Sequence, residues 1–385
     1  MLKTVAKSGN RYWNNVLRLV TKNNSHQHSL NTSSSQNHQY QQQEVESDQH
    51  ISSGTPRFYY KPITNSTSTP SSINSSKKKS NSDFFKFEYS FASFVHHGRG
   101  SSKPLISSLM DLTDSSNNLS LLPRRRLYGN PIETLSIKNG DDAMIVSPNL
   151  IGVADGVSGW SGAHANSGLF ARSFLENISR NFSELSFYNS NDLSKIKESD
   201  LSNNLDYAYK DSLQIMKNDN FNGSSTLLLG MIIDKNLKIM NIGDSKIFII
   251  RQGKIVKTNK EQYISNFSPE QVGTTIKTEK LPSSVVQFQD FPLEQDDLIL
   301  ICSDGVTDNL YQDEILDIIM GKLNKDLTNL QEVSNHLLYK TKNIAYDNYC
   351  VCPYVEKVNE LSNQFITGGK LDDISICISK VMLNE

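Results

Sequence analysis

The chain has 385 residues and a formal net charge of −2, with 39 Lys and Arg against 41 Asp and Glu. This balance leaves no excess of positive charge that would favour binding to nucleic acid. No apolar run approaches the ~18 residues of a membrane span. We therefore expect neither a nucleic-acid partner nor an integral membrane segment. Only 37% of the residues are hydrophobic, below the roughly 45–50% of globular proteins, so either the whole chain folds poorly or an unfolded part dilutes a folded one.

Residues 1–22 are basic and amphipathic, and no acidic residue occurs before Glu44. This pattern is typical of a mitochondrial transit peptide and lacks the apolar core of a secretory signal. The alternative is a solvated basic tail. The first interpretation predicts a mitochondrial location, most simply the matrix, and the second a cytoplasmic one. The five basic residues are Lys3, Lys7, Arg11, Arg18 and Lys22.

Residues 23–82 consist largely of Asn, Ser, Thr, Gln and His. Such a segment cannot bury enough apolar surface to offset chain entropy, so it is predicted to be disordered. Alternating aromatic residues then predict a strand over 84–95, before a polar insertion at about 98–126. We assign 84–383 to one folded domain that contains this insertion.

The rest of the chain alternates strand signals with paired helix signals. Short apolar runs joined by tight turns imply antiparallel sheets, and the helices come in pairs, so the predicted class is α+β. The predicted strands are 143–147, 150–154, 225–233, 237–242, 246–251, 285–288, 298–302 and 374–381. The predicted helices are 161–182, 201–217, 312–323 and 330–345.

Aspartates recur at the ends of these predicted strands. Carboxylates, carbonyls and water, without Cys or His, are the ligands of Mg²⁺ or Mn²⁺, and several together suit a two-metal site. Each aspartate alone could equally be a helix cap or a turn residue, and sequence does not say that the strand ends converge. The candidates are Asp141, Asp142, Asp155, Asp244, Asp304, Asp308, Asp372 and Asp373.

Six motifs in a fixed order resemble those of the metal-dependent type-2C (PPM) serine/threonine protein phosphatases. They are Gly140-Asp141-Asp142-Ala143, Gly152-Val153-Ala154-Asp155-Gly156, Gly223-Ser224-Ser225-Thr226, Asn241-Ile242-Gly243-Asp244-Ser245, Cys302-Ser303-Asp304-Gly305-Val306-Thr307-Asp308 and Gly369-Lys370-Leu371-Asp372-Asp373. The Asp-Gly-Val-x-Gly-Trp sequence at 155–160 is similar to the mitochondrial branch of that family.

The resemblance implies a four-layer αββα sandwich of two antiparallel sheets flanked by helix pairs. It also implies two Mn²⁺ or Mg²⁺ ions per subunit, and a weaker third is compatible with it. Asp155 would bridge the two metals, with the Gly156 carbonyl on one of them. The other metal ligands would be Asp304 and Asp372, with Asp142 holding metal-bound water. The outer-shell or third-metal positions would be Asp141, Asp244, Asp308 and Asp373.

Under this resemblance, a metal-bridging hydroxide hydrolyses phosphoserine or phosphothreonine on proteins without a phosphoenzyme intermediate. The alternatives are a pseudophosphatase that only binds phosphoproteins, and a metal-dependent hydrolase of small phosphorylated metabolites. The oligomeric state stays open.

Two positions depart from the pattern of many family members. Many family members have a His at position 157 that is a candidate general acid, and this chain has Val157 there. His164 lies nearby in sequence, but a His near a helix start is more often a polar surface residue. The phosphate-binding Arg before the first acidic motif is absent. Lys138 is the nearest cation, and it would act without a bidentate fork. Arg124-Arg125-Arg126 could serve instead, or could form a basic loop.

Overall fold

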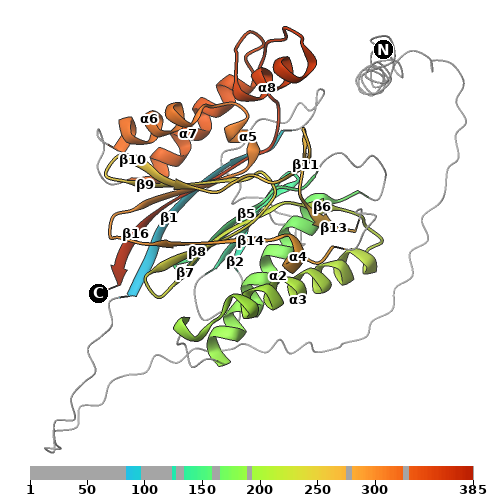
Figure 1. Cartoon of the computed structure of the whole chain (residues 1–385), viewed down its shortest axis with the longest axis vertical. Coiled ribbons are helices and arrows are strands. Elements are labelled where there is room, and N and C mark those ends of the chain that lie inside the picture. The colour runs from blue at the N-terminus through green and yellow to red at the C-terminus, as the bar shows by residue number, and fades with distance from the viewer. Residues whose placement is uncertain are drawn as a thin grey trace, which may run out of the picture. The chain divides into compact units, whose positions relative to one another are not determined.

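The computed structural model describes residues 84–96, 124–126, 134–157, 165–188, 193–274, 280–323 and 329–384. Two antiparallel sheets lie face to face in this part of the chain (Figure 1). The larger has the order β14 (Gln287–Pro292), β8 (Asn236–Ile242), β7 (Leu227–Ile233), β5 (Leu150–Ala154), β4 (Asp142–Val146), β3 (Leu135–Asn139) and β2 (Arg124–Arg126). The smaller has the order β1 (Phe84–Phe94), β16 (Ile374–Asn384), β15 (Leu298–Cys302), β9 (Lys246–Arg251) and β10 (Lys254–Thr258).

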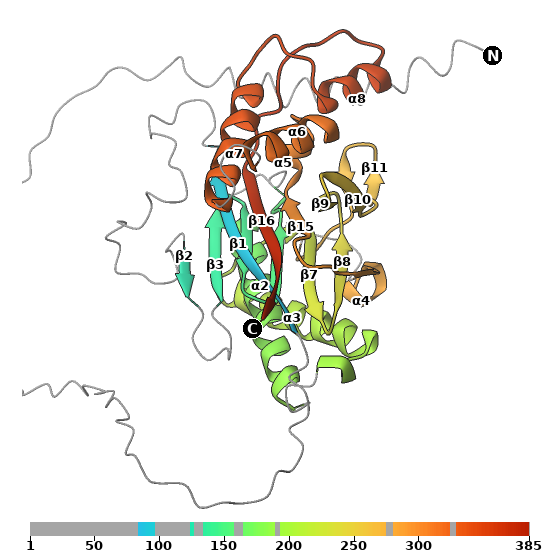
Figure 2. The same ribbon diagram turned by 90° about the vertical axis from the view of Figure 1, so that its left-hand side faces the viewer.

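Each sheet carries a pair of helices on its outer face, as Figure 2 shows from the side. Helices α2 (Ser167–Tyr188) and α3 (Glu198–Asn218) cover the larger sheet, and α6 (Gln312–Leu323) and α7 (Leu330–Ala345) cover the smaller. The short elements are η3 (Leu193–Lys195), β6 (Ser224–Ser225), β11 (Tyr263–Ser265), β12 (Ser268–Pro269), β13 (Val272–Gly273), α4 (Pro282–Val285), α5 (Asp304–Thr307) and α8 (Pro353–Ser362).

Strand alternation divides the apolar residues among three hydrophobic layers. Along β7, Leu227 and Leu229 face α2 and α3, whereas Leu228 between them faces the other sheet. Along β15, Ile301 faces the larger sheet and Leu300 packs under α6 and α7. Because successive side chains of a strand point to opposite faces, a strand that is buried on both faces has a continuous apolar sequence.

The predicted α+β class is confirmed, and so is the four-layer arrangement of two antiparallel sheets between helix pairs. The predicted strand after residue 83 is β1. It pairs over its whole length with β16, from Phe84 opposite Asn384 to Phe94 opposite Ile374.

Several boundaries differ from the predicted ones. Helix α2 begins at Ser167 rather than near 161, because the Asn166 side chain caps it by accepting a hydrogen bond from the Leu169 N–H, 3.0 Å away. Val285 ends the short helix α4 instead of beginning a strand. Arg124–Arg126 is a strand, not a loop. The sequence also gave no prediction for β3, β10 or α8.

Other expectations lie outside the described residues. These are the transit peptide at 1–22, the polar segment at 23–82, most of the insertion at 98–126, and His164. No helix within the described ranges is long and apolar enough to cross a membrane.

Candidate metal centre

Carboxylates from both sheets meet where their strands end, because the two sheets lie face to face. Asp142 opens β4, Asp155 follows β5 and Asp244 follows β8, all from the larger sheet. Asp304 follows β15, and Asp372 precedes β16, both from the smaller sheet. The convergence that sequence could not establish is therefore present in the structure.

Asp155, Asp244 and Asp304 form the tightest group. One carboxylate oxygen from each lies within 4.8 Å of those of the other two. The sequence prediction put Asp155 and Asp304 among the ligands of the two metals, and gave Asp244 as an outer-shell residue or a ligand of a weaker third metal. In the structure, Asp244 lies beside these two ligand candidates.

The segment that carries Asp155 is fixed by pairing with the β6 region. The Asp155 N–H donates to the Thr226 hydroxyl at 3.0 Å, and the Thr226 N–H donates to the Asp155 carbonyl at 2.9 Å. Gly156 follows, and a Cβ there would lie 2.2 Å from the Asp141 carbonyl oxygen. Only glycine allows this close backbone approach, which brings the 155–156 segment against the β3–β4 turn.

Asp304 and Asp308 lie at the two ends of the single-turn helix α5. Ser303 precedes this helix, and its hydroxyl accepts a hydrogen bond from the Ser375 N–H at the start of β16, 3.1 Å away. Asn309 then donates from Nδ2 to the carbonyl oxygens of Gly305 and Lys370, each at 2.9 Å. These contacts tie the β15–α5 turn to the loop that carries Asp372.

Three buried carboxylate oxygens of this cluster accept no hydrogen bond from any described residue. They are Asp142 Oδ2, Asp244 Oδ1 and Asp304 Oδ1. A buried carboxylate oxygen without a partner is costly, and a metal ion is one group that can satisfy it. The donor set therefore fits hard divalent cations such as Mg²⁺ and Mn²⁺.

Burial, and after it the crowding of like charges, raises most of the pKa values in the cluster. Burial, and then the charge of neighbouring aspartates, raises the pKa of Asp155 and of Asp142 well above the usual range. Burial chiefly raises the pKa of Asp244 to about 8 and that of Asp308 to about 7. Negative charge is therefore disfavoured in this cluster unless a cation compensates it.

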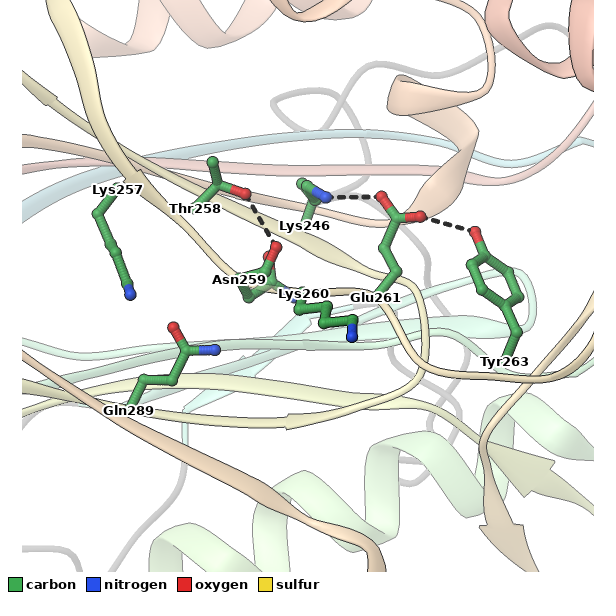
Figure 3. A pocket seen from close by; sticks show the side chains of 8 residues that line it. All are labelled: Lys246, Lys257, Thr258, Asn259, Lys260, Glu261, Tyr263 and Gln289. Atoms are coloured by element: carbon green, nitrogen blue, oxygen red, sulfur yellow. Dashed lines mark hydrogen bonds and ion pairs between the residues drawn. The ribbon is translucent and has the colours of Figure 1, made fainter.

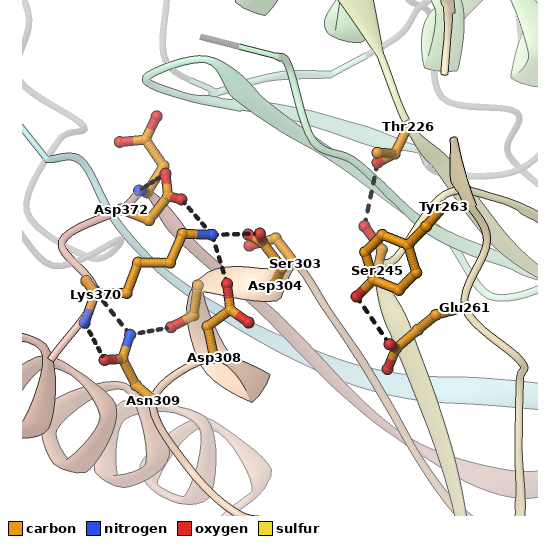
Figure 4. Close-up of polar contacts among 12 residues, drawn as sticks. Thr226, Ser245, Glu261, Tyr263, Ser303, Asp304, Asp308, Asn309, Lys370 and Asp372 are labelled. Atoms are coloured by element: carbon orange, nitrogen blue, oxygen red, sulfur yellow. Dashed lines mark hydrogen bonds and ion pairs between the residues drawn. The ribbon is translucent and has the colours of Figure 1, made fainter. Parts of the chain in front are cut away.

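Asp304 differs from its neighbours. Burial alone would raise its pKa, but the adjacent Lys370 ammonium, together with hydrogen bonding to Asp155 and Asp308, outweighs burial and lowers the pKa. Lys370 Nζ lies 2.5 Å from Asp304 Oδ2, 2.5 Å from Asp308 Oδ2 and 3.1 Å from Asp372 Oδ2 (Figure 4). The sequence prediction did not name Lys370 as a site residue. Its spacing from Asp372 could have indicated it, since residues two apart in an extended segment point to the same side.

Asp373 and Asp141 lie on the other side of Asp142. The two oxygens of Asp373 accept hydrogen bonds from the backbone N–H groups of His96 and Asp141, each at 2.7 Å. Asp373 was predicted to be an outer-shell or third-metal residue. Its observed contacts are with the backbone, and they join β1, the β3–β4 turn and β16.

Lys138 lies on β3 beside α2. Its Nζ donates to the Gly140 carbonyl at 2.8 Å, and burial lowers its pKa. Val157 donates its backbone N–H to the Ser224 carbonyl at 2.9 Å.

A hollow of about 610 Å³ opens over β10 and the segment that follows it (Figure 3). Three lysines line it, Lys246, Lys257 and Lys260, and Lys246 is paired with Glu261 at 2.7 Å. Tyr263 at its edge donates to Glu261 at 2.9 Å. Burial, and then the charge of Asp244, raises the pKa of Tyr263.

Comparison with known families agrees with this geometry. The sequence profile of the family "Protein phosphatase 2C" matches residues 139–337, just over half of the chain, and that span includes six of the eight candidate aspartates and the whole of α5. The chain belongs to the protein phosphatase 2C family.

Curated relatives share this phosphatase 2C region at modest identity. "Probable protein phosphatase 2C 71" of Oryza sativa subsp. japonica is 29% identical over 257 residues, 66% of this chain and 51% of the relative. "Protein phosphatase PTC7 homolog fig" of Drosophila willistoni is 28% identical over 262 residues, 64% of this chain and 78% of the relative. The chain thus spans about half the length of the rice relative.

The phosphatase 2C fold also occurs among solved structures. The X-ray structure of the photosystem II phosphatase PBCP superposes with a TM-score of 0.52 at 22% identity, covering 66% of this chain and 98% of that one. At this identity the likeness concerns the fold alone.

Proposed function

We propose that this protein is a metal-dependent serine/threonine protein phosphatase. The observation that carries the proposal is the set of three unpartnered, buried carboxylate oxygens on Asp142, Asp244 and Asp304. Family membership supports the reaction class. The carboxylates of the metal-bearing motifs are all present.

The residues proposed to hold two divalent ions are Asp155, Asp304 and Asp372, the Gly156 carbonyl, and Asp142 through water. The close grouping of Asp155, Asp244 and Asp304 adds Asp244 to this set. When bound, such ions would neutralise the phosphoryl group and generate hydroxide from water at neutral pH. The role of the chain is to position the reactants by holding these carboxylates on two rigid sheets.

The leaving alkoxide has no His to protonate it at position 157, because Val157 occupies that place. We propose that its proton comes from water in the site. Loss of a general acid typically costs about 10²–10⁴-fold in rate, so we expect a slower enzyme than relatives that carry the His, although still an active one.

The proposed substrates are phosphoproteins. The hollow beside Tyr263 is open to solvent and bears Lys257 and Lys260, which favours an acidic or phosphorylated peptide chain over a small enclosed metabolite. Lys138 is retained as a weaker proposal for the phosphate-binding cation. Its amine already donates to the Gly140 carbonyl, so it would have to leave this contact.

The test is phosphate release by the full chain in Mn²⁺, Mg²⁺ or EDTA, from a phosphothreonine peptide, a nucleotide and a sugar phosphate. The proposal predicts metal-dependent release, fastest from the peptide. Faster release from the small molecules would favour a metabolite hydrolase. Tight peptide binding without release would favour a pseudophosphatase.

We also propose a mitochondrial location. Its support is the basic, acid-free sequence over 1–22 and the resemblance of the 155–160 motif to the mitochondrial branch. Residues 1–22 fused to a fluorescent protein should direct it to mitochondria. A fusion in which the basic residues are changed to Gln should stay in the cytosol, and cytosolic fluorescence from both would exclude the proposal.

A further inference from the structure

Lys370 contributes the ammonium that touches the carboxylate cluster. It contacts three aspartates at once, Asp304, Asp308 and Asp372, over 2.5–3.1 Å. Its side chain is only 22% exposed. Burial alone would lower the pKa of Lys370, but the carboxylates outweigh burial and raise it well above the usual value. The amine thus faces three carboxylates at contact distance in a largely enclosed position.

The main chain of Lys370 is fixed independently of its ammonium. The Lys370 N–H donates to Asn309 Oδ1, and Asn309 Nδ2 donates to the Lys370 carbonyl, each at 2.9 Å. The ammonium itself donates hydrogen bonds to Asp304 Oδ2 and Asp308 Oδ2, and it lies 5.4 Å from the centroid of the Tyr354 ring. The side chain can therefore leave the carboxylates without any change in the backbone.

Asp304 belongs to two sets of contacts. Its Oδ2 accepts from Lys370, while its Oδ1 has no partner among the described residues. Asp304 also lies in the close group with Asp155 and Asp244. A divalent ion on that group would stand next to the Lys370 ammonium, and two cations sharing one carboxylate repel each other.

We propose that Lys370 is an exchangeable internal cation, which neutralises Asp304 and Asp372 in the metal-free protein and must move away when a divalent metal binds. This inference rests on the metal-dependent function proposed above. Lys370 stabilises the metal-free cluster because its positive charge offsets part of the carboxylate charge that a metal would otherwise neutralise. By the same contacts it weakens metal binding, since its displacement costs free energy that a neutral residue would not require.

The test is calorimetric titration of Mn²⁺ into the full-length, metal-free protein, with Lys370→Gln beside wild type. Because the displaced ammonium contacts three carboxylates, the variant should bind Mn²⁺ on the order of tenfold more tightly. Lys254→Gln makes the same change of net charge at an exposed position on β10, and should bind as wild type does. Unchanged or weaker binding by Lys370→Gln overturns the proposal.

These outcomes separate the proposal from the proposed function. Wild-type protein that binds no Mn²⁺ would overturn both. If wild-type protein binds Mn²⁺ and Lys370→Gln binds it no more tightly, only the proposal that metal displaces Lys370 is overturned.

A second measurement needs no variant. Lysine acylation followed by peptide mass spectrometry reports how accessible the Lys370 amine is in EDTA and in Mg²⁺. We expect Lys370 to be protected in EDTA and labelled faster in Mg²⁺, while labelling of Lys254 stays constant. Equal labelling of Lys370 in both conditions overturns the proposal even if Lys370→Gln fails to fold.

Discussion

The backbone N–H of Asp141 donates a hydrogen bond to Asp373 Oδ2, 2.7 Å away, and so joins the β3–β4 turn of one sheet to the residue that precedes β16 in the other. A Cβ at Gly140 would lie 2.1 Å from that same oxygen, so the contact needs glycine at this position of the turn. The neighbours of this pair, Asp142 and Asp372, are ligand candidates. The junction between the sheets thus sets the relative position of two carboxylates that belong to different sheets.

We predict that Asp373→Asn lowers stability more than an ordinary surface substitution does. An Asn side chain cannot accept both backbone hydrogen bonds, and a hydrogen bond to a charged acceptor contributes roughly 1.5–3 kcal/mol. For a domain of this size we expect a melting temperature lower by about 4–8 °C. Asp211→Asn, at an exposed ion pair with Arg180, should change it little. Equal melting temperatures for the two variants would show that Asp373 does not hold the sheets together.

Glycine at 156 is predicted to be essential for the site. In Gly156→Ala the new methyl would meet the Asp141 carbonyl oxygen at 2.2 Å, so the 155–156 segment must shift away from the turn. We expect Mn²⁺ affinity, measured by calorimetry, to fall by at least about tenfold. Gly321→Ala on α6 is the matched control, because nothing lies within 4 Å of its Cβ. It should stabilise the protein by roughly 0.5–1 kcal/mol through helix propensity and leave metal affinity unchanged.

Stability of the metal-free protein should fall as pH rises. The pKa of Asp244 is raised to about 8 and that of Asp308 to about 7, above the value near 3.9 of an unfolded Asp. Between about pH 4 and pH 8 the folded state therefore binds more protons than the unfolded state, and each such group lowers the unfolding free energy by up to about 1.4 kcal/mol per pH unit.

Metal should reverse this trend, because it binds the deprotonated carboxylates and releases their protons. The measurement is the melting temperature from pH 5 to pH 8.5, in EDTA and in Mg²⁺. We expect the increase caused by Mg²⁺ to be larger at pH 8 than at pH 6. An increase that is independent of pH would mean that these carboxylates do not hold the metal.

The central strands could be predicted from sequence because they are buried on both faces. Leu298–Cys302 and Leu227–Ile233 are continuous apolar runs bounded by turns, and both were located closely. Edge elements carry a weaker signal. Strand β10 is largely exposed or half-buried and borders the sheet, and β3 alternates apolar residues with Ser136 and Lys138 over only five positions.

The site could be predicted only in part for a related reason. Each aspartate was identified from its place at a strand end, but which carboxylates share a cation depends on how the two sheets pack. That packing brings Asp244 beside Asp155 and Asp304, and it turns Asp373 toward the backbone of the other sheet. The position of the Lys370 ammonium is set by the same packing, because its partners come from both α5 and the 370–373 loop.

The most direct test of the metal-dependent phosphatase account is phosphate release from a phosphothreonine peptide by wild type and Asp304→Asn, at increasing Mn²⁺ concentration. Asp304 belongs to the close carboxylate group, and its Oδ2 contacts the Lys370 ammonium, so removing its negative charge weakens both interactions. We predict wild-type turnover that saturates with Mn²⁺ and disappears in EDTA, and a loss of at least about a hundredfold in a folded Asp304→Asn. Turnover that survives EDTA, or is retained in Asp304→Asn, would contradict a metal-dependent reaction at this cluster.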